Sequence, residues 1–465
     1  MRGLTTVVTF GLVVATIVAL LSLLDDPATE VVGAWSELSP EGCPVEQLET
    51  LRHSAIVYTW VNGKEPCYNE RRKAAGLSPG GNSRDKEMGE LKYSLRSLLK
   101  FAPWLEGPIY IVSPGQIPDW LDMSNPRIKV VDQDDLLPAD VVKLPNFDTN
   151  VIEQYLHRIP GLTDIFIHMN DDYIFVKDIQ PSHLFTCHGG GIRMLTEINH
   201  IRHASNAWLA SVRNTLQLTD SVYGGQHVYN FMKHAPFVYS RLAHEAIHAK
   251  PVFKTALDAT AVNQVRTATD LNFPLLHAVY MIEEGSKALG VPYTLNPTSE
   301  SESTWLLVRL TDSDAGRAEM NNVFSRVLRG DGKELCLALN DEYSTDETAA
   351  IVQAFYDKLL PVPGPHERST PSTLRSNYHG PNCAYDRSVI PYPTKPNLAQ
   401  AWQTRRSFLP PLRYELSRFF AASSAWEVVA VVGFVGGAAF AAALSVLLYQ
   451  ILHPDTAAEN NQKSS

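Results

Sequence analysis

Short apolar runs alternate with helical patterns through the first half of the chain. Four runs are rich in β-branched and aromatic residues and end near turn-forming residues; they span 55–61, 109–112, 128–131 and 165–169. Between the first two runs, leucines recur at helical spacing on one face of residues 88–99, and Pro103 follows them. Strands that alternate with helices at this spacing predict an α/β fold with a mostly parallel, Rossmann-like sheet.

The second half of the chain has a different pattern. Residues 225–290 have the pattern of mostly helical structure, so we expect a helical C-terminal half. Residues 360–400 are rich in Pro, Ser and Asn, a composition typical of a linker or an extended flap. No internal repeat is visible, which argues against a solenoid or a propeller.

Two segments are uncharged and long enough to span a bilayer, at residues 4–24 and 428–452. Arg2 precedes the first segment and two aspartates follow it, which favours a cytosolic N-terminus. A cleaved signal peptide is the alternative interpretation of that segment. Trp426 and Tyr449 lie near the ends of the second segment, where interfacial aromatic residues are common. We therefore expect two transmembrane helices that flank the rest of the chain.

These segments divide the chain into its expected parts. They are an N-terminal anchor at 1–24, a linker at 25–52, a catalytic domain at 53–345, a C-terminal extension or linker at 346–425, a transmembrane helix at 426–452 and a short cytosolic tail at 453–465. The catalytic domain would then face the lumen of the Golgi or another secretory compartment. Arginines 405, 406, 413 and 418 beside the second span count against this placement, as does the lack of a permitted Asn-x-Ser/Thr acceptor.

The composition narrows the classes of function. The chain has 465 residues, of which 45% are hydrophobic and 19% charged, as in a globular protein. The formal net charge is -10 and no long Lys/Arg block is present, which argues against a nucleic-acid partner. The five cysteines form no CxxC or Cys/His cluster, so a structural zinc site is not expected. A lumenal location permits disulfides, and the odd count leaves at least one thiol unpaired within the monomer.

Asn170-Asp171-Asp172 is the strongest chemical signal in the sequence. The triplet follows the apolar run 165–169, so its carboxylates emerge where a strand is expected to end. Open α/β sheets bind ligands at that edge. Two adjacent carboxylates beside an amide suit a hard divalent cation such as Mg²⁺ or Mn²⁺. On these three residues alone, a solvated turn is the competing interpretation.

A second signal is an aromatic strand that runs into a tight turn at 58–63. Trp60 could stack on a base or a sugar, while the turn at Asn62-Gly63 offers backbone amides to a phosphate. The alternative is an Asn-Gly turn beneath a tryptophan of the core.

Beyond these signals, the sequence resembles the Stealth family, which includes bacterial capsular-polysaccharide phosphotransferases and the eukaryotic lysosomal-enzyme GlcNAc-1-phosphotransferase precursor. The first matching block is 57–63. The second runs from Glu90-Leu91-Lys92-Tyr93 through His157-Arg158-Ile159-Pro160-Gly161-Leu162 to the acid triplet. The third contains His234-Ala235-Pro236, Val265-Arg266 and Asp270, and the fourth contains Leu335-Cys336-Leu337 with Asn340-Asp341. Ala338-Leu339 interrupts the fourth block, and Phe237 replaces the second histidine of the lysosomal type.

The resemblance implies a fold of the nucleotide-sugar transferase type and a specific reaction. A sugar 1-phosphate would pass from a nucleotide sugar, UDP-GlcNAc or GDP-mannose, to a hydroxyl of a glycan or glycoprotein, and a nucleoside monophosphate would leave. His234 would be the general base, Arg266 would clamp the phosphate, and Asp171 with Asp172 would hold Mg²⁺ or Mn²⁺. The animal enzyme's large recognition modules are missing, so recognition of lysosomal hydrolases is not implied. A homodimer is a further expectation.

The resemblance also implies contacts to the donor. The expected substrate-binding residues are Trp60, Asn62, Gly63, Asp85, Glu90, Arg96, Asn170 and Asp270. For Arg96 a structural role is an equal alternative, and for Arg266 the alternative is a salt bridge to Asp270 or another acid. Two further functions stay open: a metal-dependent glycosyltransferase, and a non-catalytic membrane protein that binds glycans.

Overall fold

The computed structural model of the protein describes residues 45–80, 87–186, 191–197, 205–224, 230–342, 345–370, 373 and 375–391. All of them belong to the first of two compact units, Met1–Ala401; the second is Trp402–Ser465. The segments expected to cross a membrane, 1–24 and 426–452, lie outside the described residues. Within the described part of the chain, no helix has both the length and the apolar character that a bilayer span needs.

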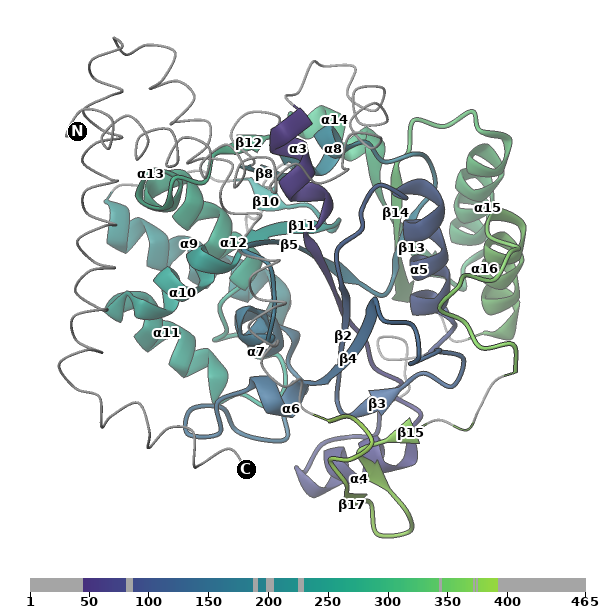
Figure 1. The fold of residues 1–465 in the computed structure, drawn as a ribbon, viewed down its shortest axis with the longest axis horizontal. Coiled ribbons are helices and arrows are strands. Elements are labelled where there is room, and N and C mark those ends of the chain that lie inside the picture. Colours follow the sequence, from purple (N-terminus) through teal and green to yellow (C-terminus); the bar gives the residue numbers. More distant parts are fainter. Residues whose placement is uncertain are drawn as a thin grey trace, which may run out of the picture. The chain divides into compact units, whose positions relative to one another are not determined.

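The main sheet has five strands in the order β11-β5-β1-β2-β4. These strands are β1 (Ala55–Thr59), β2 (Ile109–Ser113), β4 (Ile128–Asp132), β5 (Ile165–Asn170) and β11 (Phe237–Ser240). The first four are mutually parallel, and β11 joins β5 in the antiparallel sense. The mostly parallel α/β sheet predicted from the apolar runs is therefore confirmed, and all four predicted strands are present (Figure 1).

Alternate residues of each strand enter different cores, as strand geometry requires. Ile56 and Ile111 face the cluster that contains the leucines of α5 (Glu90–Phe101), whereas Val57 and Tyr110 face a second cluster. Leu91, Leu95 and Leu98 are fully buried, so the predicted amphipathic helix is confirmed.

The second half is helical only in part. Its helices α9 (Ala207–Tyr223), α10 (Arg241–Ala249), α11 (Pro251–Ala261), α12 (Phe273–Tyr280) and α13 (Ser286–Leu289) lie on one side of the sheet in Figure 1. The expectation of a helical C-terminal half is wrong for Phe237–Ser240, which form β11 of the main sheet, and for β13 (Trp305–Thr311) and β14 (Cys336–Glu342), which form parallel strands. β14 also pairs with β6 (Tyr173–Phe175), in the antiparallel sense. Burial alternates in the second part of β13, where exposed Arg309 lies between buried Val308 and Leu310.

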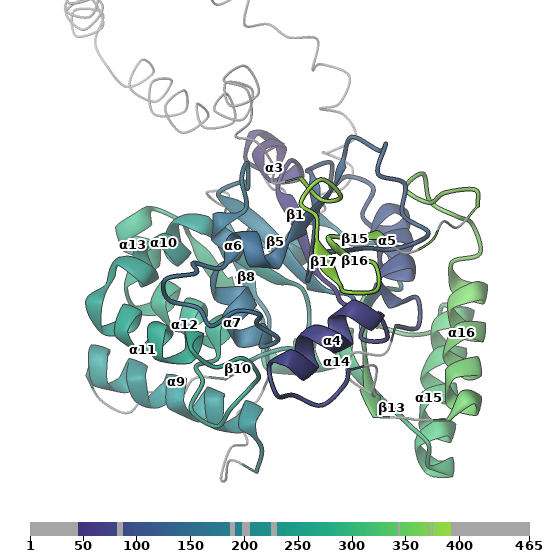
Figure 2. The same cartoon turned by 90° about the horizontal axis from the view of Figure 1, so that it is seen from below.

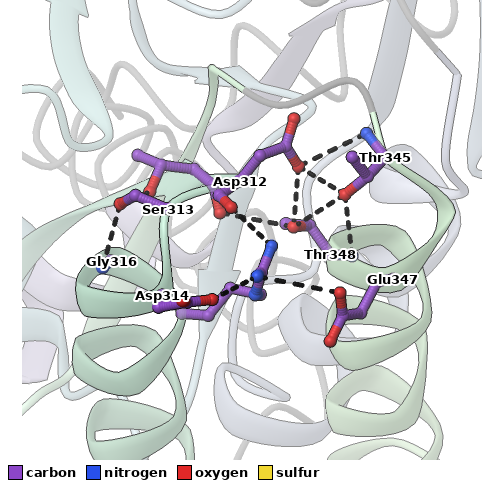
Figure 3. A network of polar contacts seen from close by, with 9 residues as sticks. Asp312, Ser313, Asp314, Gly316, Thr345, Glu347 and Thr348 are labelled. Atoms are coloured by element: carbon purple, nitrogen blue, oxygen red, sulfur yellow. Dashed lines mark hydrogen bonds and ion pairs between the residues drawn. The ribbon is translucent and has the colours of Figure 1, made fainter.

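Two helices, α15 (Asp314–Arg329) and α16 (Asp346–Leu359), pack together beside this second sheet (Figure 1). The rings of Phe324 and Phe355 stack with centroids 4.0 Å apart. At the other end, the Asp312 carboxylate accepts hydrogen bonds from Thr345 and Thr348, which ties β13 to the start of α16 (Figure 3). The packed core thus continues beyond residue 345, where an extension or linker was expected.

Residues 375–391 form what we call the C-terminal strap. Its strands are β15 (Arg375–Ser376), which pairs with β3 (Gln116–Ile117), and the hairpin of β16 (Tyr378–His379) and β17 (Ala384–Tyr385). A disulfide between Cys67 and Cys383 ties the strap to α4 (Pro66–Ala74), and Figure 2 shows the two side by side. The strap begins at the turn after β2, where Asn377 donates its backbone N–H to the Gly115 carbonyl.

The remaining elements are short. They are α3 (Val45–Arg52), α6 (Gln133–Leu136), α7 (Thr149–Gln154), a 3₁₀ turn (Leu156–Arg158), α8 (Pro181–Leu184), β7 (Phe185–Thr186), β8 (Gly191–Met194), β9 (Thr196–Glu197), β10 (Phe231–Met232), a π-helical turn (Met281–Gly285), β12 (Tyr293–Leu295) and α14 (Thr298–Thr304). Leu48 and Leu51 of α3 are buried, so the folded part begins inside the segment expected to be a linker.

Candidate functional site

The carboxyl ends of β1 and β5 bring two predicted motifs to one edge of the sheet. Thr59 at the end of β1 lies opposite Asn170 at the end of β5. The Thr59 hydroxyl donates a hydrogen bond to Asn170 Oδ1 at 3.4 Å. The aromatic turn at 60–63 and the acid triplet therefore leave the sheet as neighbours, at the edge where open α/β sheets bind ligands.

His234 meets the acid triplet directly. Its Nε2 lies 3.2 Å from Asp172 Oδ2, and its Nδ1 lies 3.0 Å from the Tyr173 hydroxyl. A carboxylate only accepts, so Nε2 carries the proton and donates to Asp172. In neutral His234 the Tyr173 hydroxyl then donates to Nδ1. Burial raises the pKa of Tyr173 well above its usual value, so that hydroxyl stays protonated.

Long-range strand pairing places His234 there. The residue lies in the short connection between β10 and β11, and β11 runs back along β5. Lys233 secures the start of this connection: its N–H donates to the Leu195 carbonyl, and its Nζ donates to Glu197 Oε2 at 2.9 Å. The Lys233–Glu197 ion pair was not foreseen from the sequence.

The surrounding charges favour the protonated form of His234. Burial among its neighbours acts to lower its pKa, but the charge and hydrogen bond of Asp172 act in the opposite direction. Glu153 and Glu197 add to that effect, and the pKa is raised overall. The side chain is 35% exposed, so a substrate hydroxyl can reach it.

Glu153 is a second carboxyl near His234, and it is missing from the residues expected to form the site. It lies on α7 and is 8% exposed. Burial raises its pKa to about 7, although the charges of Arg266 and His234 act to lower it. Glu153 thus lies within electrostatic reach of both. Glu153 belongs, with Ile152, to the second block that resembles the Stealth family. Its place in that block was the signal by which it could have been found from the sequence.

Arg266 does not form the salt bridge to Asp270 that was its alternative. Its Nη2 donates to Thr149 Oγ1 at 2.6 Å, and its buried Nε has no hydrogen-bond partner. Within the described residues no acid pairs with it at ion-pair distance. The guanidinium keeps unused donors, as a group that binds an anion requires.

The structure corrects the expectation that Asp270 touches a substrate. Asp270 is fully buried, and its two oxygens accept hydrogen bonds from Asn263, Thr267 and Asn150. A carboxylate enclosed in this way shapes the loop that carries Arg266 and has no face left for a ligand.

The acid triplet partly fits the expected cation. Asp172 Oδ1 is buried and has no hydrogen-bond partner, and half-buried Asp171 precedes it. An orphaned carboxylate oxygen next to a second carboxyl suits Mg²⁺ or Mn²⁺. No group of three or more metal-ligating side chains is found in the described part of the chain. The remaining ligands would have to come from substrate and water.

The structure also corrects the expectation of stacking on Trp60. The indole is 5% exposed, and its Nε1 donates to Glu87 Oε2 at 2.5 Å. A buried indole has no free face for a base, so the alternative of a core tryptophan holds. Half-buried Asn62 forms a turn with its Oδ1 on the Lys64 N–H, and its own N–H donates to Gln116 Oε1 at 2.8 Å.

The other expected donor contacts lie elsewhere or have internal partners. Asp85 lies outside the described residues. Glu90 is 7% exposed and accepts the Met88 N–H at the start of α5. Arg96 clamps Glu367 with two hydrogen bonds of 2.6 Å, so the structural alternative holds for it. Asn170 accepts from Thr59 and donates to the Tyr173 hydroxyl at 3.4 Å, which orients the turn.

The fourth block supports the acid triplet from behind. β14 pairs with β6, which starts at Tyr173, and the Leu339 N–H donates to the Asp172 carbonyl at 3.1 Å. Asn340 pairs with Arg309 along β13 and is half-buried. This block therefore holds the triplet in place from the second sheet.

Comparison with known families agrees with this geometry. Residues 84–192 match the family model of Stealth protein CR2, conserved region 2, and residues 233–283 match Stealth protein CR3, conserved region 3. The first match contains Glu153, Asp171 and Asp172, and the second contains His234 and Arg266. The residues that converge in space are thus drawn from both conserved regions.

Individual relatives extend over more of the chain. A capsular polysaccharide phosphotransferase of Haemophilus influenzae is 31% identical over 265 residues, which cover 52% of this chain and 71% of that protein. Two exopolysaccharide phosphotransferases of Streptomyces coelicolor are 31% and 29% identical; each match covers 67% of this chain and, respectively, 51% and 52% of the relative. The chain thus spans about half the length of these Streptomyces relatives.

Among solved structures, the galactosyltransferase LgtC in complex with donor and acceptor sugar analogues is similar over 67% of this chain and 96% of its own. The identity is 12% and the TM-score is 0.35. A likeness this distant carries no argument about function.

Proposed function

This chain belongs to the Stealth family, and we propose that it is a sugar-1-phosphate transferase that acts on a glycan hydroxyl. The donor would be a nucleotide sugar, UDP-GlcNAc or GDP-mannose, and the product a phosphodiester. One observation carries the proposal: His234 meets Asp172 at 3.2 Å at the carboxyl edge of the sheet, and the charge of Glu153 is coupled to those of His234 and Arg266. Phosphoryl transfer needs a base near the attacking hydroxyl and a positive group near the phosphoryl oxygens, and His234 and Arg266 can supply these.

In this reaction the acceptor oxygen attacks the phosphorus that carries the sugar. A new P–O bond forms, the bond to the bridging oxygen breaks, and the nucleoside monophosphate leaves with that electron pair. His234 takes the acceptor proton on Nδ1 as general base, and the Tyr173 hydroxyl gives up the hydrogen bond that it donates there. Asp172 holds the imidazole through Nε2 and, with Glu153, stabilises the imidazolium that results. This division of work follows the logic of a catalytic triad.

Arg266 holds the phosphates. Its Nη2 is directed by Thr149, and its unpartnered Nε can complete a two-pronged contact to phosphate oxygens. Asp171 and Asp172 would hold Mg²⁺ or Mn²⁺, which supplies positive charge to the phosphoryl oxygens when bound. Asn62 and Gly63 stay proposed contacts of the donor diphosphate, at the turn beside the triplet.

The location of the site is also a proposal. A membrane-anchored chain with its catalytic domain in the lumen of the Golgi or a related compartment would meet both nucleotide sugars and glycans. The disulfide between Cys67 and Cys383 supports this placement, because disulfides persist in oxidising compartments. A homodimer also stays a proposal.

The test is a donor screen with the purified protein. UDP-GlcNAc and GDP-mannose are incubated with candidate polysaccharides, with and without Mg²⁺ or Mn²⁺, and the products are resolved by mass spectrometry. We expect a nucleoside monophosphate and a phosphodiester-linked sugar. A nucleoside diphosphate would instead establish a glycosyltransferase.

Two variants sharpen this screen. Asp172→Asn should abolish turnover, whereas Glu319→Gln, at an exposed acid of α15, should leave it unchanged. Equal turnover by the wild type and Asp172→Asn would refute the proposed site.

A further inference from the structure

The loop that carries Arg266 is built on a neighbouring loop. We call residues 263–270 the arginine loop and residues 143–150 the support loop. The hydrogen bonds that join these segments include Lys143 N–H to Ala261 O, just before the arginine loop (3.3 Å), Phe147 N–H to Gln264 O (2.8 Å), Asn146 Nδ2 to Asn263 O (2.8 Å) and Gln264 Nε2 to Pro145 O (2.8 Å). The support loop leads directly into α7, which carries Thr149 and Glu153. A shift between the two loops would therefore move Arg266 relative to both residues.

Asp270 is the centre of the arginine loop. Its Oδ1 accepts hydrogen bonds from Asn263 Nδ2 at 2.7 Å and Thr267 Oγ1 at 2.8 Å. Its Oδ2 accepts from the Thr267 N–H at 2.6 Å and from Asn150 Nδ2 at 3.4 Å. Both oxygens of Asp270 are therefore already occupied by donors.

Asp148, in the support loop, is also fully buried, and Asn150 links it to Asp270 by donating its N–H to one acid and its Nδ2 to the other. Its Oδ1 caps α7 by accepting the Asn150 N–H at 2.9 Å. Its Oδ2 is buried without a partner in ordinary hydrogen-bond geometry, and the group that acts on it is the Asp270 carboxyl. Burial first, and then the charge and hydrogen bonding of Asp270, raise the pKa of Asp148 to about 8.

Other charges do not relieve this arrangement. The positive group that acts on Asp148 is Arg266, and its effect is smaller than those of burial and Asp270. The side chains of Asn146, Asn150, Asn263 and Thr267 around the two acids are neutral. Two ionised carboxylates in one buried site repel each other, and a shared proton removes the repulsion.

We propose that Asp148 and Asp270 share one proton, and that this carboxyl pair positions the Arg266 guanidinium for the donor phosphates. The proton resides on Asp148 and is directed at Asp270, so it closes the gap between the support loop and the arginine loop. Thr149, the next residue after Asp148, then holds Arg266 Nη2. Loss of the proton leaves two facing carboxylates and displaces the guanidinium from Thr149. The inference that the pair positions Arg266 for the donor phosphates rests on the proposed function. The inference of a shared proton does not.

The proton itself is tested by stability against pH. The raised pKa of Asp148 means that the folded state retains a proton which the unfolded state loses near pH 4, so the contribution of Asp148 to wild-type stability falls between about pH 4 and pH 8 and is constant above. Asp148→Asn mimics the neutral acid and lacks this fall. The ratio of its folding equilibrium constant to that of wild type should rise by up to about tenfold per pH unit across that window. Asp140→Asn, at an exposed acid of the same region, should show a flat ratio. A flat ratio for Asp148→Asn would overturn the shared proton.

The positioning role is tested with inorganic pyrophosphate as the probe, by calorimetry at pH 7.0 and 9.5. At pH 9.5, wild type and Asp140→Asn should bind pyrophosphate at least about fivefold more weakly than Asp148→Asn does. Only in Asp148→Asn does the residue that faces Asp270 stay neutral at this pH. Arg266→Ala should abolish the difference. Equal affinities of wild type and Asp148→Asn at pH 9.5 would overturn the positioning role. A chain that shows the stability difference but turns over no nucleotide sugar would refute the proposed function and leave the shared proton standing.

Discussion

The clamp between Arg96 and Glu367 gives the sharpest quantitative prediction. Arg96 was expected to contact the donor, yet its Nε and Nη2 each donate to one carboxylate oxygen of Glu367 at 2.6 Å, and its Nη1 donates to the Leu360 carbonyl at 2.8 Å. The two side chains are only 10% and 7% exposed. The clamp joins α5 to the segment that follows α16, so its loss should weaken the fold.

Arg96→Met removes three hydrogen bonds and leaves the buried Glu367 carboxylate with a hydrogen bond from the Gly364 N–H, at 2.7 Å. Two charge-assisted hydrogen bonds contribute about 1.5–3 kcal/mol each. Removal of one partner of a buried ion pair costs about 3–5 kcal/mol, and the two figures agree. We therefore expect the free energy of unfolding to fall by about 4 kcal/mol in Arg96→Met. The double variant Arg96→Met/Glu367→Met should cost at least about 2 kcal/mol less than the sum of the single variants, because no charge is then left unpaired.

Urea unfolding followed by tryptophan fluorescence measures these values, with the slope of the transition as the check on two-state behaviour. Arg329→Met is the matched control: Arg329 pairs with Asp331 at 2.7 Å, but the side chains are 62% and 60% exposed. An exposed pair contributes about 0–1 kcal/mol. The reasoning is refuted if Arg96→Met costs less than about 1 kcal/mol, or if its main effect is a raised KM for the donor.

Three further predictions follow from the site and the core. Asp172→Asn should slow nucleoside monophosphate release by at least about 100-fold while the far-UV circular dichroism spectrum is unchanged, since one charged group at the reacting centre is removed; a smaller loss would contradict its role. Burial lowers the pKa of His157 and His277 to about 3, so the contribution of each histidine to stability is complete above pH 6.5 and falls below it, by up to about 1.4 kcal/mol per pH unit, and wild type should lose stability relative to His157→Gln/His277→Gln in urea titrations at pH 7.5, 6.0 and 5.0; a pH-independent difference between the two would disprove it. Cys67→Ser and Cys383→Ser should each lower stability by about 2–4 kcal/mol and expose the strap to limited proteolysis, with no added loss in the double variant; additive losses would argue against the disulfide.

Local patterns in the sequence were sufficient for the four parallel strands of the main sheet and for α5, but not for β11. The period of two in strands and of 3.6 in helices is a property of neighbouring residues, so β1, β2, β4, β5 and α5 could be predicted with small errors at their ends. The position of the acid triplet at a strand end followed from the same pattern. The resemblance to the Stealth family added His234 and Arg266, which periodicity alone would not have singled out.

Contacts between distant segments decided the rest. Asp172 meets His234 because β11 reverses along β5, and no local pattern encodes that pairing. Trp60 and Arg96 each have a polar group at the end of the side chain. From the sequence alone, each could contact a ligand or another part of the protein. Their partners Glu87 and Glu367, 27 and 271 residues away, made one a core residue and the other a clamp.

Contacts between distant segments also decide the role of each acid, so only the tertiary structure distinguishes one aspartate from another. In the sequence, Asp172, Asp270 and Asp148 are three similar residues, and each could have been exposed or buried. In the fold, one keeps an orphaned oxygen beside a histidine, one is enclosed by four donors, and one faces another carboxyl. The sequence determined which chemical groups are available at the sheet edge; desolvation and charge, which depend on the neighbours that folding supplies, determined what each group can do.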